Sequence, residues 1–230
     1  MLNLNENYEA FMGDGSKDSA GRTLEEFLSE YDPYKYKNPS VTADIVVLKE
    51  KNNVDSTTNN TGLQLLLIRR KNHPCINEWA LPGGFAEIDE TLLQSAKREL
   101  EEETQVRDVP MQQLRTWGDP NRDPRGRVIT VSYLAYLEEE VEVVASDDAK
   151  DAGWVDVKLT LVDTVRSKQI VKQIYFMELS NSEKNIFLTA NVARITNKIG
   201  RLSETTYEIH SKQGIAFDHA KIILDALLSE

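Results

Sequence analysis

Three glutamates with helical spacing are the residues of this sequence that most clearly could do chemistry. Glu99 and Glu103 lie four positions apart and Glu102 follows Glu99 by three, so a helix would bring them onto one face. Like charges at these spacings repel each other. Carboxylate oxygens are the ligands that Mg²⁺ and Mn²⁺ prefer, and such a cation would cancel the repulsion. The spacing therefore predicts a divalent-metal site.

The helix that must carry these glutamates is predicted over residues 91–104. Thr91, followed three positions later by Gln94, matches a capping box, so we expect Thr91 to be the N-cap. Apolar residues at helical spacing predict the buried face: Leu92, Ala96 and Leu100. We expect the glutamates to lie roughly opposite this apolar stripe.

Two neighbouring features complete the predicted site. The Gly83-Gly84 pair allows a tight turn, so that a glycine carbonyl can reach the metal. Arg98 lies eight residues after Glu90, and we expect the two to pair and to hold the preceding loop against the helix. Glu90 and Arg98 are thus predicted to be structural.

A solvated glutamate-rich helix is the simpler interpretation, and the long fixed spacing argues against it. Gly84, five residues, Glu90, seven residues and then "RELEEE" resembles the Nudix box. The resemblance covers 84–106 and departs from the family pattern at Gln105, where the family has glycine; Val106 supplies the aliphatic residue that follows. That glycine ends the helix, so we expect Gln105 to weaken the cap and to leave metal binding intact.

The resemblance implies an α/β fold, a Nudix-type α/β/α sandwich with a mixed sheet. It implies Mg²⁺ (or Mn²⁺) held by the Gly84 carbonyl, Glu99, Glu102 and Glu103, and it makes these three glutamates the expected catalytic residues. Glu99 and Glu103 are both candidates for the general base. The implied reaction is hydrolysis of the diphosphate bond of a nucleoside diphosphate derivative.

Residues 39–157 and 214–230 also resemble the ADP-ribose pyrophosphatase branch of the family, which implies ADP-ribose as substrate, AMP and ribose 5-phosphate as products, and a homodimer. Four arginines are candidates for substrate binding: Arg69, Arg70, Arg122 and Arg125. Each could instead be a solvated surface charge. We expect Asp218 and His219 to be a capping pair at the start of the last helix.

The order of predicted elements favours a mixed-sheet sandwich. A strand rich in β-branched residues is predicted at 41–50, and a returning strand with a short apolar run at 63–71. An alternating strand is predicted within 122–137, a short strand within 147–157, and an amphipathic helix at 214–230. We divide the chain into an N-terminal extension (1–38), a Nudix core (39–157), an insertion (158–213) and the C-terminal helix of the core (214–230). The insertion could be strands or short helices, serving as a dimer interface or a substrate lid.

Composition places the protein in the cytoplasm. The 230 residues contain one cysteine, Cys75, and we find no membrane-spanning apolar run and no secretory signal. The net charge of −11 makes a nucleic-acid partner unlikely by composition. The substrate, a nucleoside diphosphate derivative, and a second copy of the chain are the expected partners.

Two other functions stay open. Nudix-related transcriptional regulators resemble this branch but carry a winged helix after the helix that begins "AFDH", whereas that helix ends this sequence and the box keeps every charged position. The segment 196–207, "TNKIGRLSETTY", could still form a turn leading into a helix. A module that binds a sugar nucleotide without hydrolysing it is the remaining alternative.

Overall fold

The computed structural model describes residues 11–51, 60–138, 143 and 149–229, and the chain divides after Asn38 into two compact units. The first unit contains α1 (Leu24–Glu30), whose N-cap Thr23 forms a capping box with Glu26. The polar residues 51–62 predict a loop between two strands, and most of this segment lies outside the described residues. No helix in the described part is long and apolar enough to cross a membrane.

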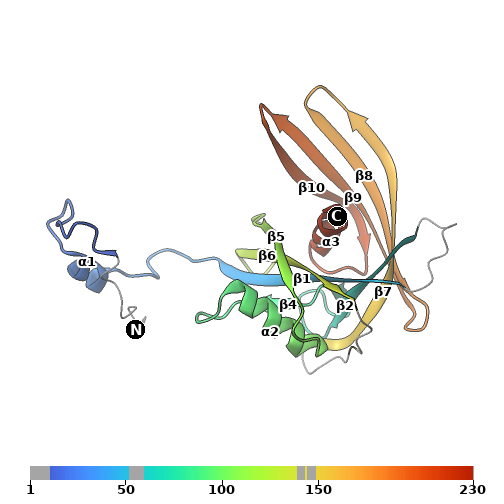
Figure 1. The fold of residues 1–230 in the computed structure, drawn as a ribbon, viewed down its shortest axis with the longest axis horizontal. Coiled ribbons are helices and arrows are strands. Elements are labelled where there is room, and N and C mark those ends of the chain that lie inside the picture. The colour runs from blue at the N-terminus through green and yellow to red at the C-terminus, as the bar shows by residue number, and fades with distance from the viewer. Residues whose placement is uncertain (1–10, 52–59, 139–142, 144–148, 230) are drawn as a thin grey trace. The chain divides into compact units, whose positions relative to one another are not determined.

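The second unit is built on one ten-stranded sheet (Figure 1). Its strands run in the order β10-β9-β8-β7-β2-β1-β6-β5, with β3 beside β2 and β4 beside β1. Among the strand pairs within the described residues, β1 and β6 alone are parallel, so the sheet is mixed. The bounds are β1 Ser40–Glu50, β2 Asn60–Arg70, β3 Trp79–Ala80, β4 Gly83–Phe85, α2 Leu92–Thr104, β5 Met111–Trp117, β6 Val128–Leu137, β7 Ala149–Arg166, β8 Ile170–Asn181, β9 Ile186–Ile199, β10 Leu202–Gln213 and α3 His219–Leu227.

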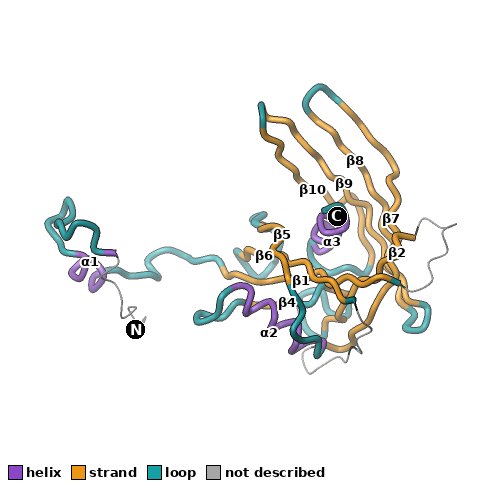
Figure 2. Tube along the Cα trace, in the orientation of Figure 1, coloured by secondary structure: helices purple, strands orange, loops and turns teal. Residues whose placement is uncertain are grey.

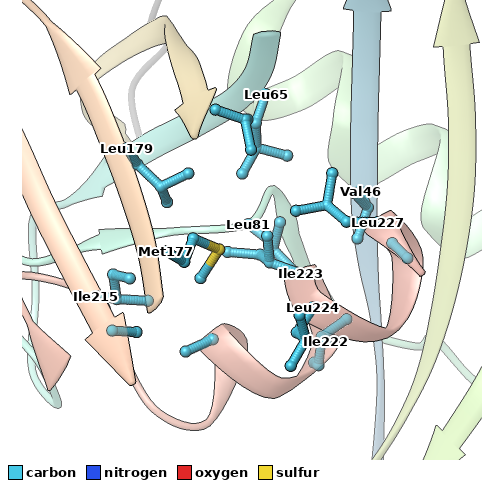
Figure 3. Packing of buried hydrophobic residues seen from close by; sticks show 14 of the residues in the cluster. Val46, Leu65, Leu81, Met177, Leu179, Ile215, Ile222, Ile223, Leu224 and Leu227 are labelled. Carbon is cyan, nitrogen blue, oxygen red and sulfur yellow. The ribbon is translucent and has the colours of Figure 1, made fainter. Parts of the chain in front are cut away.

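The central strands bury both of their faces. Ile45 and Val47 pack with α2 on one side of the sheet, whereas Val46 and Leu48 pack with α3 on the other. Because side chains alternate along a strand, one apolar run in β1 serves both layers. Figure 3 shows Val46 with residues of α3 in the second of these cores. The predicted α/β fold with a helix on each face is thereby confirmed.

Residues 158–213 continue the same sheet. The distal half of β7, with β8, β9 and β10, forms an antiparallel extension that curves around α3 (Figures 1 and 2). The two edge strands meet, because the Arg115 Nη1 of β5 donates to the Thr205 carbonyl of β10 at 2.9 Å. The Trp117 and Tyr207 rings lie 5.5 Å apart across the same junction. The expected turn into a helix at 196–207 is wrong, since Ile199 and Leu202 pair across a β-hairpin.

Gln105 takes the conformation that favours glycine. It caps α2 with φ 62° and ψ 11°, and its N–H donates to the Glu101 carbonyl at 2.8 Å. We expect Gln105→Gly to stabilise the protein by about 1 kcal/mol, because glycine has no Cβ to strain this left-handed backbone. Thermal unfolding should show a midpoint raised by about 2–4 °C. Gln105→Ala keeps the Cβ and is the control; an equal gain from both variants would contradict this account of the cap.

Candidate active site

One cavity of about 530 Å³ lies where α2, β4 and the start of α3 approach each other. This volume is within the usual range of small-molecule sites. Acidic side chains line it from several elements: Asp44, Glu87, Glu99, Glu103 and Asp123. Basic side chains line it as well: Arg70, Lys71, His73, Arg98, Arg122, Arg125 and His219. A cavity with both signs of charge suits a ligand that carries phosphates together with a cation.

Glu103 is a buried carboxylate of this cavity, as Asp44 and Asp123 are, and only 8% of its surface is exposed. Burial raises its pKa to about 8, against the opposing effect of the Gly83 N–H, which donates to Glu103 Oε2 at 2.8 Å. The neighbouring charges of Glu99 and Asp44 add to the rise. A cation bound beside Glu103 would stabilise the ionised form of this carboxylate.

The expected position of the glutamates opposite the apolar stripe is wrong for Glu103. Glu103 is buried together with Ala96 and Leu100 on the inner side of α2. The reason is helical geometry: Glu103 follows Leu92 by eleven residues, which is close to three full turns. Glu103 therefore continues the core face of α2, whereas Glu102, whose side chain is 52% exposed, lies toward solvent.

Arg98 connects the helix to the loop that precedes it. Its Nε lies 2.8 Å from Glu90 Oε1, and its Nη2 donates to the Phe85 carbonyl at 3.1 Å. Its Nη1 donates to Glu99 at 2.9 Å and to Glu102 at 3.0 Å. The guanidinium thus fastens the residues after Gly84 onto α2 and bridges two of the three glutamates.

The donor set fits a divalent cation. Gly84 lies so close to Glu99 that an added Cβ would come within 2.5 Å of its carboxylate atoms, so the Gly84 backbone and this carboxylate are in contact. Carboxylate and carbonyl oxygens are the ligands that Mg²⁺ takes. Within the described ranges, no three acidic, histidine or cysteine side chains already converge as a ligand set, and Arg98 instead bridges Glu99 and Glu102. Cation binding would therefore need these two side chains to turn away from Arg98.

Gly84→Ala should lower the turnover of any metal-dependent reaction here by about 100-fold, since misplacing a reacting group by about 1 Å can cost that much. The new methyl group would displace the Glu99 carboxylate. Initial rates at saturating Mg²⁺ would measure this effect. Gly118→Ala is a matched control, because its Cβ would meet only Arg127 at 3.8 Å. A fully active Gly84→Ala enzyme would show that the contact with Glu99 has no role.

The four predicted substrate arginines differ in their surroundings. Arg122 is almost fully buried and pairs with Asp218 at 2.7 Å, and Arg125 pairs with Asp123 at 2.7 Å. Both arginines line the cavity, and an aspartate partner already neutralises the charge of each. Arg69 donates to the Asn77 carbonyl and does not line the cavity.

Arg70 is the cavity arginine best placed to take an anion. Its Nε donates to the Pro74 carbonyl at 2.8 Å, and its guanidinium lies 4.9 Å from the centre of the Phe217 ring. Among the residues that the structure describes, no carboxylate lies within ion-pair distance of it. Its charge lies near Glu103, whose pKa it lowers.

The expected capping role of Asp218 and His219 is wrong. The Asp218 side chain makes no cap hydrogen bond and holds Arg122 instead. His219 Nδ1 accepts the Leu81 N–H at 2.9 Å, so neutral His219 carries its proton on Nε2, which lies 3.8 Å from Asp44. Burial lowers the pKa of His219 and favours this neutral form.

Asp44 is one of the cavity residues that the sequence did not identify. It lies in the middle of β1, between apolar neighbours, and only 6% of its surface is exposed. The sequence does contain a signal for it, because Asp44 is the single acidic residue in the apolar run "VTADIVVL". A charge buried in a strand needs a partner, so such a residue is a candidate for a site.

Comparisons with known proteins agree with this geometry. A family model described as NUDIX domain matches residues 42–173. The chain is 37% identical over 122 residues to an ADP-ribose pyrophosphatase of Methanocaldococcus jannaschii, covering 53% of this chain and 64% of that protein. It is 30% identical over 161 residues to the ADPR responsive transcriptional repressor NtrR of Acinetobacter baylyi, covering 69% of this chain and 61% of that protein. The alignments thus span less than two thirds of either relative.

Two solved structures show the same fold. A MutT/nudix family protein from Enterococcus faecalis aligns over 90% of this chain and 69% of its own, with 34% identity and a TM-score of 0.60. The NUDIX domain of Shewanella oneidensis NrtR, in a cocrystal with ADP ribose, aligns over 58% of this chain and 82% of its own, with 34% identity and a TM-score of 0.50.

Proposed function

This chain belongs to the Nudix family, and we propose that it hydrolyses the diphosphate bond of a nucleoside diphosphate derivative, with ADP-ribose as the substrate and AMP and ribose 5-phosphate as products. The observation that carries the proposal is the meeting of Glu99 and Glu103 with Arg70 on the wall of one cavity. The relative named as an ADP-ribose pyrophosphatase and the structural neighbour crystallised with ADP ribose support the choice of substrate.

Glu99, Glu102, Glu103 and the Gly84 carbonyl would hold Mg²⁺ or Mn²⁺. When bound, the cation would neutralise the negative charge that develops on the diphosphate. In the proposed reaction water attacks one phosphorus atom, the bridging P–O bond breaks, and the second phosphate leaves with the bond electrons. Glu99 or Glu103 accepts the proton of the attacking water, and the Gly83 N–H fixes the orientation of Glu103.

Arg70 would bind a phosphate oxygen directly, because its guanidinium reaches the cavity without a carboxylate partner in the described part of the chain. Arg122 and Arg125 would act through their pairs with Asp218 and Asp123, which hold the α3 and 122–125 sides of the cavity in place. Arg69 does not line the cavity, so its position does not support a role in substrate binding.

Substrate choice can be tested with purified protein and Mg²⁺. ADP-ribose would be assayed beside NADH, diadenosine polyphosphates and nucleotide sugars, and chromatography would measure the nucleotide that each reaction releases. We expect ADP-ribose to give the highest kcat/KM. Faster hydrolysis of another compound would keep the reaction class and replace the substrate.

Ligand-responsive control of transcription is the second candidate function. The relative named as a transcriptional repressor aligns over a larger share of this chain than the pyrophosphatase does. The similarity to this repressor weakens the expectation, drawn from net charge, that a nucleic-acid partner is unlikely. Electrophoretic mobility of DNA upstream of the protein's own coding sequence, with and without ADP-ribose, would test this function; ligand-dependent binding without hydrolysis would favour the regulator.

A homodimer and a cytoplasmic location complete the proposal. Both come from the family resemblance and the composition. Sedimentation equilibrium would test the dimer directly, and a single species with the mass of one chain at micromolar concentration would contradict it.

A further inference from the structure

Two phenylalanine rings in the cavity have no part in the chemistry described so far. Phe85 ends β4, directly after Gly84, and Phe217 lies in the loop just before α3. Both line the cavity that contains Glu99 and Glu103, and Phe85 is 43% exposed. Apolar rings beside a charged site suit the uncharged, flat part of a ligand.

Flat groups already lie over both rings. The Arg125 guanidinium carbon is 4.9 Å from the centre of Phe85 and 5.8 Å from the centre of Phe217, and that of Arg70 is 4.9 Å from Phe217. The longest of these contacts, between Arg125 and Phe217, is near the outer limit for a cation over a ring. The Arg125 side chain is 42% exposed, so it has room to move away from Phe217.

The backbone of Phe217 is held in an unusual conformation. Its φ is +46°, a region that a bulky residue rarely adopts. Hydrogen bonds on both sides keep it there: the Ala216 N–H donates to the Trp79 carbonyl at 2.8 Å, and the His219 N–H donates to the Ala216 carbonyl at 3.2 Å. Strained backbone of this kind gathers at ligand sites, where it fixes the direction of a side chain.

We propose that Phe217 is the platform on which the nucleobase of the substrate stacks, with Arg125 and Phe85 on the opposite wall. The base would enter between Phe217 and Arg125, where the present contact is weakest. Phe85 directly follows Gly84, so this wall begins beside the proposed metal ligands, and one nucleotide would extend from its phosphates at the carboxylates to its base at Phe217. This subsite rests on the proposed function, since it assigns the nucleoside part of the same substrate.

The test compares a ligand that has a base with one that lacks it. Calorimetry would measure the binding of AMP and of ribose 5-phosphate to the wild type and to Phe217→Leu, in Mg²⁺. We expect Phe217→Leu to weaken AMP binding roughly 10-fold, as for the loss of one base–aromatic stack, and to change ribose 5-phosphate binding less than 2-fold. Phe187→Leu is the matched control, because Phe187 is 61% exposed on β9 and does not line the cavity.

The subsite would be overturned by unchanged AMP affinity in Phe217→Leu, by an equal loss for both ligands, or by a wild type that binds AMP no more tightly than ribose 5-phosphate. Phe217→Trp guards against a folding defect in the leucine variant, because it keeps a ring and should retain AMP affinity; loss of AMP affinity in a folded tryptophan variant would count against the proposal.

The subsite and the hydrolase proposal can fail separately. AMP binding needs no turnover, so a protein that shows the expected Phe217 effect without hydrolysing ADP-ribose keeps the subsite and loses the hydrolase. Unchanged KM for ADP-ribose in an active Phe217→Leu enzyme keeps the hydrolase and overturns the subsite.

Discussion

Glu103→Gln should lower kcat for ADP-ribose by about 10³-fold, within the range that removal of a catalytic acid–base group produces. Glutamine matches glutamate in size and can still accept the Gly83 N–H, but it brings no negative charge to a cation and cannot take a proton from water. Steady-state rates would measure the loss, and thermal unfolding would confirm that the variant is folded.

Glu101→Gln is the matched control on the same helix. Glu101 is about half exposed and pairs with Arg107 at 3.0 Å, outside the cavity. Its removal should leave kcat within about 2-fold, because exposed ion pairs contribute little. Equal losses in the two variants would point to a general effect of charge on α2, and wild-type activity in Glu103→Gln would remove this residue from the mechanism.

The stability of the metal-free protein should fall as pH rises toward 8, and Glu103 is the cause. Its pKa is about 8 in the folded protein and near 4.5 when it is unfolded, so between these values the folded state binds more protons. The contribution is complete below pH 4.5 and is lost as pH rises through 8. Within this window it declines by about 1.4 kcal/mol per pH unit.

Urea unfolding in EDTA at several pH values would measure this decline. Glu103→Gln has no proton to lose at this position, so its free energy of unfolding should exceed that of the wild type increasingly as pH rises. Mg²⁺ should restore wild-type stability most strongly at the alkaline end, because the cation competes with the proton for the same carboxylate. Parallel pH curves for wild type and variant would contradict the raised pKa.

Features set by neighbouring residues were predictable from the sequence. Thr91 and Gln94 form the predicted capping box, and the strands expected at 41–50 and 63–71 are β1 and β2 within a few residues. The strands of residues 158–213 were harder to predict, because the alternation of apolar and polar residues is interrupted there. Register shifts between Leu161 and Asp163, and between Ile209 and Ser211, exchange the two faces of the sheet within single strands.

Contacts between distant residues could not be predicted from spacing. Arg122 meets Asp218 across 96 positions, and the Leu81 N–H meets His219 across 138. Both contacts depend on how α3 folds back against the sheet, which no local pattern specifies. The position of Glu103 on the core side of α2 is different, because it follows from the eleven-residue spacing after Leu92 and was available from the sequence.

The measurement that tests the central claim most directly is chromatography of ADP-ribose after incubation with the wild-type protein, in Mg²⁺, in EDTA, and in EDTA followed by excess Mg²⁺. If the carboxylates hold a catalytic cation, we expect equal amounts of AMP and ribose 5-phosphate with Mg²⁺ and no product with EDTA. Product formation should recover when Mg²⁺ is returned. ADP-ribose that stays intact in Mg²⁺, while still raising the melting temperature of the protein, would contradict hydrolysis and identify the cavity as a binding site.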